Sequence, residues 1–310
     1  MLKHGAALSN SPAASQPTGI ERQTGAATAM ELPVFLAVLA AAAMHAGWNA
    51  GLKLKLDPFL AMTLVVATGG LIGLALTAWF GWPRQESWPY LFGSVVLHLG
   101  YYLGLTEAYR RADMGQIYPL ARGSAPLMTA MLGIFILGES VSRLGFAGVA
   151  LLACGVLLMA WRGGSRSQPP DRVALGYALF TAVMICGYSI CDGMGARISG
   201  DPHAYSAALF VVDGVVWCGF AFWRAGPAAF QPLTTHFWPG LGGGALSVGA
   251  YWVAIWAMTK APIPLVAALR ESSVLFATAI SIFLLGEKLT LARLAAVGLI
   301  VCGIAAIRLQ

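Results

Sequence analysis

The chain has 310 residues, of which 58% are hydrophobic and only 10% are charged, and its mean hydropathy is +0.73. Soluble domains carry about 25% charged residues, so this composition excludes an ordinary soluble protein. The formal net charge of +6 comes from basic residues that are scattered singly or in pairs. Because they form no basic cluster, we expect no nucleic-acid partner.

The chain begins with a segment, residues 1–29, that is rich in Ala, Ser, Gly and Thr and has no apolar run. Such a segment cannot bury a core, so a disordered tail is predicted. Ten continuous apolar runs follow. Each is long enough to cross the roughly 30 Å hydrocarbon layer, where the backbone must form a helix. The predicted spans cover residues 32–51, 58–80, 88–109, 115–137, 143–161, 173–193, 203–224, 237–258, 262–285 and 291–308.

The longest connection, residues 162–171, contains Gly, Ser and two prolines and is predicted to be a flexible linker. It separates a first unit, residues 30–161, from a second unit, residues 172–310. The second unit repeats the first: Arg270 and Ser272 follow Arg122 and Ser124 by 148 positions. Five spans in each unit is an odd number, so the second unit enters the membrane from the opposite side. The predicted fold is an all-α polytopic membrane protein made of two inverted five-helix repeats.

A Leu-Gly-Glu turn closes the fourth span and returns after the ninth, at residues 137–139 and 285–287. An acidic side chain beside a helix N-terminus accepts hydrogen bonds from free amides. We therefore interpret Gly138, Glu139, Gly286 and Glu287 as structural turns.

The five-plus-five layout, the two Leu-Gly-Glu turns and the motif His45-Ala46-Gly47-Trp48-Asn49 resemble the EamA-type members of the drug/metabolite transporter superfamily. The resemblance extends from about residue 31 to residue 308. It implies a transporter with cytoplasmic termini, and we expect no cofactor. It also implies a central cavity lined by spans 1, 3, 4, 6, 8 and 9, with spans 5 and 10 at the periphery. The family carries amino acids, nucleosides, sugars and drugs, so the resemblance does not name a substrate.

Arg122 and Arg270 lie inside apolar spans, where a charged residue costs about 2.5–3.5 kcal/mol and needs a partner or water. Two interpretations stay open. The arginines either bind a carboxylate or phosphate of the substrate, or they connect helices through carbonyl groups or a fixed acid. Glu271 adjoins Arg270 but cannot face it on a helix, so we expect it to turn towards Arg122.

Three residues are candidates for proton coupling: Glu271, because a buried carboxyl group can exchange protons near neutral pH, and the two histidines His45 and His98. A structural partner for Arg122 is an equal alternative for Glu271, and hydrogen-bonded core positions are the alternative for the histidines. Asp213 is expected to form a structural pair away from the cavity, and Asp192 to reach the membrane interface.

Aromatic and polar residues on the spans that the resemblance assigns to the cavity complete a predicted small-molecule site with mostly apolar walls. Core packing is the alternative for each of them. They are Trp48, Asn49, Tyr102, Tyr118, Tyr188, Tyr251 and Trp252.

We therefore expect a multi-pass protein of the cell (inner) membrane. Its expected function is that of a secondary transporter that exports a small polar or amphipathic metabolite, either amino-acid-like or another organic anion, by alternating access as a monomer. The alternatives are a lipid-linked-sugar flippase, a membrane-embedded enzyme and a scaffold. An enzyme would need a nucleophile–base pair or a metal cluster, and neither H-E-x-x-H nor G-x-S-x-G occurs. The five cysteines lack metal-ligand spacing, so no metal site is expected.

Overall fold

The computed structural model describes residues 30–51, 56–111, 114–163, 172–285 and 290–310, and every regular element in this part of the chain is a helix. The predicted tail at 1–29, most of the predicted linker, and Gly286 and Glu287 lie outside the described residues. The helices are α1 (Leu32–Gly51), α2 (Pro58–Phe80), η1 (Gln85–Ser87), α3 (Trp88–Arg111), α4 (Met114–Phe135), α5 (Arg143–Gly163), α6 (Arg172–Ile198), α7 (Pro202–Ala225), η2 (Gly226–Phe230), α8 (Gln231–Thr235), α9 (Phe237–Met258), α10 (Ile263–Arg270), α11 (Ser273–Leu285) and α12 (Leu291–Leu309).

The long helices match the predicted spans to within a few residues, with one exception. The ninth span is not continuous, because the chain leaves the α-helix at Glu271 and Ser272 and divides into α10 and α11. Within the described residues, seven helical stretches are long and apolar enough to cross a membrane, and α4 and α5 contain shorter apolar stretches. Large apolar side chains such as Leu74, Phe135 and Phe283 point outwards, as a lipid-facing surface requires.

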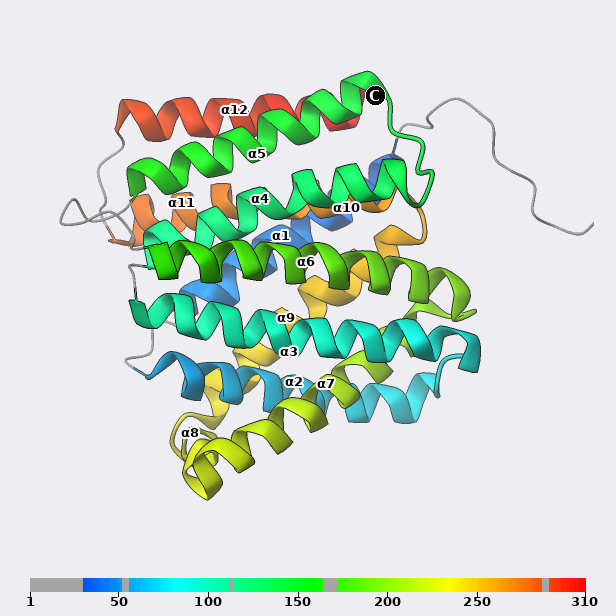
Figure 1. The fold of residues 1–310 in the computed structure, drawn as a ribbon, viewed down its shortest axis with the longest axis vertical. Helices are drawn as coiled ribbons and strands as arrows, with labels where there is room; N and C mark the ends of the chain where they lie inside the picture. The colour runs from blue at the N-terminus through cyan, green and yellow to red at the C-terminus, as the bar shows by residue number, and fades with distance from the viewer. Residues whose placement is uncertain (1–29, 52–55, 112–113, 164–171, 286–289) are drawn as a thin grey trace, which may run out of the picture.

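The packing of the helices has the two-fold pattern of an internal repeat. The helices are stacked side by side, from α5 and α12 on one side of the bundle to α2 and α7 on the opposite side (Figure 1). In the repeat, α1 is equivalent to α6 and α3 to α9, and the two corresponding pairs, α1–α9 and α6–α3, are both packed together. The pairs α2–α7, α5–α12 and α4–α10 each consist of two equivalent helices, and the members of each pair also contact each other. The cavity described below therefore lies between two halves of equivalent architecture.

Glycines allow these pairs to approach closely. A Cβ atom on Gly104 would lie 2.7 Å from the Thr181 hydroxyl oxygen, between α3 and α6. A Cβ atom on Gly303 would lie 2.7 Å from the Gly148 carbonyl oxygen, between α12 and α5. Helices in lipid associate chiefly through such close packing, so these small residues stabilise the bundle.

The two ends of the bundle are held by different polar contacts. At one end, here called the Arg110 end, Arg110 is 3.6 Å from Asp57 and 3.2 Å from Glu107, while Arg224 is 3.5 Å from Glu107. These contacts join α2, α3 and α7. At the opposite end, here called the Arg197 end, Arg197 at the C-terminus of α6 binds the segments that follow α4 and α9.

We predict that Gly303→Ala destabilises the protein and that Gly298→Ala, on the same helix, does not. The new methyl group at position 303 would overlap the backbone of α5, whereas a Cβ at position 298 meets no atom within 4 Å. Overpacking of this kind costs about 1–3 kcal/mol, while alanine is the better helix former at an open position. Thermal unfolding of the two purified variants in detergent tests this prediction, and equal melting temperatures would contradict it.

Candidate functional site

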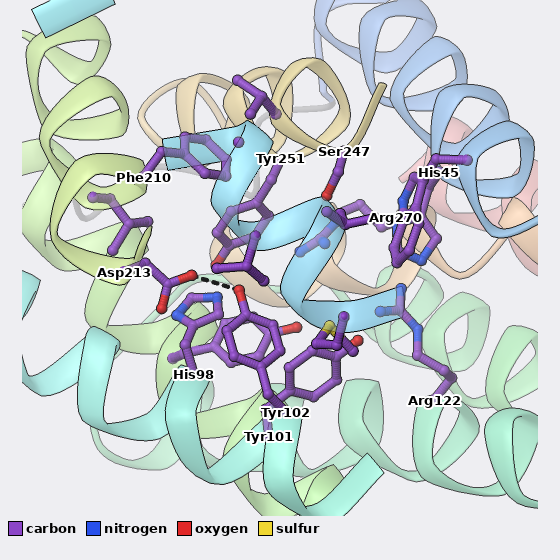
Figure 2. A pocket seen from close by; sticks show the side chains of 18 residues that line it. His45, His98, Tyr101, Tyr102, Arg122, Phe210, Asp213, Ser247, Tyr251 and Arg270 are labelled. Carbon is purple, nitrogen blue, oxygen red and sulfur yellow. Dashed lines mark hydrogen bonds between the residues drawn. The ribbon is translucent and has the colours of Figure 1, made fainter. Parts of the chain in front are cut away.

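A cavity lies between the two halves, and Figure 2 shows the side chains that line it. The space between its lining side chains, including the part that is open to the outside, is about 720 Å³. Helices α2 and α7 contribute to its wall together with α1, α3, α4, α6, α9 and α10, so the wall contains two helices beyond the six spans that the resemblance implied. The lining residues are His45, Trp48, Met62, Val65, Val66, Gly69, His98, Tyr101, Tyr102, Arg122, Tyr188, Leu209, Phe210, Asp213, Ser247, Val248, Tyr251 and Arg270.

A buried ion pair joins the two halves beside this cavity. Arg122 on α4 donates from Nε to Glu271 Oε2 at 2.8 Å, and its Nη2 lies 2.7 Å from Oε1. The two side chains are 2% and 4% exposed. This bidentate geometry is the strong form of an arginine–carboxylate contact. Glu271 does turn towards Arg122, as its position beside Arg270 predicted. It is the fixed acid that the second interpretation of the arginines, a connection between helices, required for Arg122.

Glu271 occupies the interruption between α10 and α11. The backbone there forms tighter bonds of the 3₁₀ type: Glu271 N donates to Ala268 O, and Val274 N donates to Glu271 O. The equivalent position in the first half is Gly123, and α4 continues through it as a regular helix. The second half therefore differs from the first at the residue that pairs with Arg122. A 3₁₀ stretch within a helix often marks a functional hinge.

Arg270 has a different environment from Arg122, although the two are equivalent in the repeat. Its guanidinium carbon lies 4.6 Å from the ring centre of Tyr251. Among the residues that the structure describes, Arg270 forms no ion pair and donates no hydrogen bond, although it is only 8% exposed. Its donors therefore face the cavity. An arginine in this position can bind an anionic group that enters the site.

Asp213 on α7 lines the cavity and accepts a hydrogen bond from the Tyr102 hydroxyl at 2.5 Å (Figure 2). It does form a pair, as the sequence indicated, but this pair is part of the cavity wall rather than distant from it. Asp192 was expected at the membrane interface, and this expectation is wrong. It is fully buried and accepts hydrogen bonds from the hydroxyl groups of Tyr205 and Tyr251.

The aromatic residues of the cavity contact one another through their rings. His98 stacks on Tyr188 with 4.1 Å between ring centres, and Tyr251 meets both rings edge-on. His98 Nδ1 lies 3.1 Å from both the hydroxyl and the carbonyl oxygen of Ser94. His45 Nδ1 accepts a hydrogen bond from Trp48 Nε1 at 3.2 Å. Both histidines are thus hydrogen-bonded members of the wall.

Three predicted site residues do not contribute described side chains to the cavity. Asn49 donates to the carbonyl oxygen of His45 within α1. Trp252 donates to Nδ1 of His203 at 2.8 Å and packs against Phe80, outside the lining. Tyr118 belongs to α4, but its side chain is outside the described part of the chain.

The Leu-Gly-Glu turn after α4 has a role that its sequence did not indicate. Gly138 has a positive φ of 66°, which favours glycine. Glu139 does not cap α5, because the hydroxyl of Ser142 accepts from the amide of Gly145 there. Instead, Glu139 binds Arg197 Nη1 at 2.6 Å, and Arg197 also donates to the carbonyl oxygens of Met258 and Ala261. Arg197 therefore ties α6 to the ends of α4 and α9.

Comparison with known proteins identifies relatives. The chain is 27% identical over 101 residues to multidrug resistance protein EbrB of Bacillus subtilis (strain 168), a match that covers 33% of this chain and 82% of EbrB. A solved crystal structure superposes with a TM-score of 0.71 at 19% identity, covering 89% of this chain and 96% of that one. This likeness shows a shared fold. The model of the EamA-like transporter family matches residues 31–161 and 172–309. The chain is therefore a member of the EamA-like transporter family.

Proposed function

We propose that this membrane transporter is a secondary transporter that exports a small amphipathic metabolite, either amino-acid-like or another organic anion, across the cell (inner) membrane. It works by alternating access, as a monomer, and a proton gradient drives it. The export direction rests on the similarity to a protein named for multidrug resistance. The substrate site is the cavity between the two halves.

The environment of Arg270 carries this proposal. A buried guanidinium whose donors have no acceptor among the described residues is costly, unless a ligand supplies the acceptor. Arg270 lies in the cavity wall against Tyr251, and the other lining residues are mostly apolar or aromatic. An organic anion with an apolar body complements both features.

Arg122 has a different part in this proposal. Its charge is already balanced by Glu271 through two short contacts, so it does not provide the open cationic group of the site. We assign the pair to connecting α4 with the α10–α11 interruption. A rearrangement of the α10–α11 interruption then also displaces Arg122, and with it α4 in the other half of the cavity wall.

Alternating access is supported by the unequal ends of the bundle. At the Arg110 end, Arg110 and Arg224 form partly exposed contacts of 3.2 to 3.6 Å with Asp57 and Glu107. At the opposite end, Arg197 connects α6 with Glu139 and with the carbonyl oxygens after α9. We propose that these contacts keep the Arg197 end closed and break when the transporter changes state.

The experiment that tests the proposed function uses the full chain in proteoliposomes loaded with a mixed metabolite pool. Mass spectrometry then follows which compounds leave, with and without a pH gradient, relative to protein-free liposomes. We expect selective loss of amphipathic anions or amino-acid-like compounds and faster loss with the gradient. If folded protein releases no compound selectively, the chain does not transport metabolites, and a flippase or a scaffold becomes the better hypothesis.

We predict that Arg270→Gln lowers the release of the identified compound by about tenfold or more. Glutamine retains hydrogen-bonding capacity but loses the charge, and hydrogen bonds to charged groups contribute about 1.5–3 kcal/mol. The matched control is Arg84→Gln, since Arg84 lies outside the cavity lining. Equal release by the Arg270→Gln variant and the wild type would remove Arg270 from the site.

We predict that Arg122→Gln lowers the melting temperature strongly and that the double variant Arg122→Gln/Glu271→Gln recovers most of the loss. The single change leaves Glu271 buried without its cation, which costs about 3–5 kcal/mol, whereas neutralising both members removes that cost. Thermal unfolding in detergent compares the three proteins. If Arg122→Gln melts like the wild type, the pair does not contribute to stability as proposed.

We predict that Glu139→Gln opens the Arg197 end more often. Arg197 then loses its ion pair with the α4–α5 turn and retains only bonds to two carbonyl oxygens. The measurement is the rate at which a membrane-impermeant thiol reagent modifies Ser247→Cys from that side of the membrane, after replacement of the five native cysteines. We expect faster modification than in the otherwise identical protein that retains Glu139. An unchanged rate would show that the ion pair does not hold this end closed.

A further inference from the structure

Asp213 is an acid in the cavity wall whose charge is not balanced by any cation in the described residues. It is 5% exposed, and Tyr102 donates to its Oδ2 atom. Within the described ranges, its other oxygen, Oδ1, has no hydrogen-bond partner. A carboxylate buried at this depth is costly unless a cation or donor reaches it. Because Asp213 lines the cavity, a ligand in the cavity can supply the cation or hydrogen-bond donor that Oδ1 lacks.

The surroundings of Asp213 are those of an ammonium site. Aromatic rings accompany the carboxylate: Tyr102 from α3 binds it, and Phe210 lies one turn away on α7 and packs against Tyr251. A cation close to aromatic faces is attracted by the ring quadrupole, and the carboxylate adds a direct ion pair. The wall formed by α2 beside it is apolar, with Met62, Val65 and Val66.

Arg270 does not balance Asp213, because no ion pair joins them and Arg270 lies over the ring of Tyr251. The hydroxyl of Tyr251 donates to Asp192, and this bond fixes the ring next to Arg270. In Figure 2, Asp213 lies at the left of the cavity, and Arg270 lies to the right of Tyr251. The cavity therefore offers an open cation and an open anion at separate places.

We propose that Asp213 binds an ammonium group of the substrate while Arg270 binds its carboxylate, so that the substrate is a zwitterion with an apolar or aromatic body. This inference rests on the proposed transport function and narrows its substrate class. A simple organic anion would leave Asp213 without a partner, and a simple amine would leave Arg270 without one. Each mismatch leaves a buried polar group unpaired, and this is how a site rejects an analogue that lacks one group.

The test is calorimetric binding of matched compounds to the purified full chain in detergent. Each set contains an apolar amino acid, its analogue without the amino group and its analogue without the carboxylate, for example phenylalanine, 3-phenylpropionate and 2-phenylethylamine. A leucine set is built in the same way, and all other amino acids are screened singly. We expect at least one amino acid to bind about tenfold or more tightly than either of its analogues.

The variants assign the preference to residues. Asp213→Asn is expected to lower the affinity for the amino acid to that for the carboxylate analogue, and to leave the affinity for that analogue within twofold of the wild-type value. Arg270→Gln is expected to lower the affinity for the amino acid to that for the amine analogue, and to leave the affinity for the amine analogue within twofold of the wild-type value. The matched control is Arg84→Gln, which lies outside the lining and is expected to leave the affinities for all three compounds within twofold of the wild-type values.

Three results would overturn the inference. The first is equal binding of the amino acid and its carboxylate analogue by the wild type, a readout that does not depend on whether a variant folds. The second is a retained preference in Asp213→Asn, which would be expected if Asp213 served only as a proton site. The third is binding of no amino acid by a protein that does release other anions from the mixed pool. In that case the transport function stands and the zwitterion assignment fails, whereas absence of any selective release removes the transport function itself.

Discussion

The rest of the structure depends on the buried contact between Arg122 and Glu271. Each residue alone would be a charge in a medium that cannot solvate it, and together they form a bidentate pair with contacts of 2.7 and 2.8 Å. The pair crosses from the first repeat to the second, so it connects the two halves at the level of the cavity. It also fixes the polar joint between α10 and α11, because Glu271 forms part of that joint. Packing of the surrounding apolar helices brings the halves together, and this pair adds a buried polar contact between them.

This pairing explains why two arginines that are equivalent in sequence are not equivalent in the site. Gly123 follows Arg122, while Glu271 follows Arg270, and the single acid is used by the arginine of the opposite half. Arg270 is consequently left facing the cavity, with the ring of Tyr251 as its neighbour. The departure from symmetry produced one connecting pair and one cation that lines the cavity.

The acids in the interior show a similar division of roles. Asp192 receives two tyrosine hydroxyl groups and supports the wall from behind, whereas Asp213 receives one and faces the cavity. Each hydroxyl group supplies one of the hydrogen bonds that water would otherwise give to these carboxyl groups. The aromatic residues thus act in two ways, as apolar walls through their rings and as donors through their hydroxyl groups. A cavity built in this way is suited to ligands that are apolar in the middle and polar at the ends.

The amino-acid sequence by itself determined the class of the protein, the helical spans and the repeat. Lipid provides no hydrogen-bond partner for the backbone, so a long apolar run has to be a helix wherever it lies in the chain. The sequence also placed Arg122, Arg270 and Glu271 inside spans and indicated that Glu271 turns away from its neighbour. Only the tertiary structure decided that α2 and α7 line the cavity, that the ninth span divides at Glu271, and that Asp213, Asp192 and Tyr205 belong to its polar framework. It also removed Asn49 and Trp252 from the cavity lining and gave Glu139 a partner in Arg197. The physical reason is that these contacts depend on the rotation, tilt and register of each helix relative to its neighbours, which local hydrophobicity does not specify.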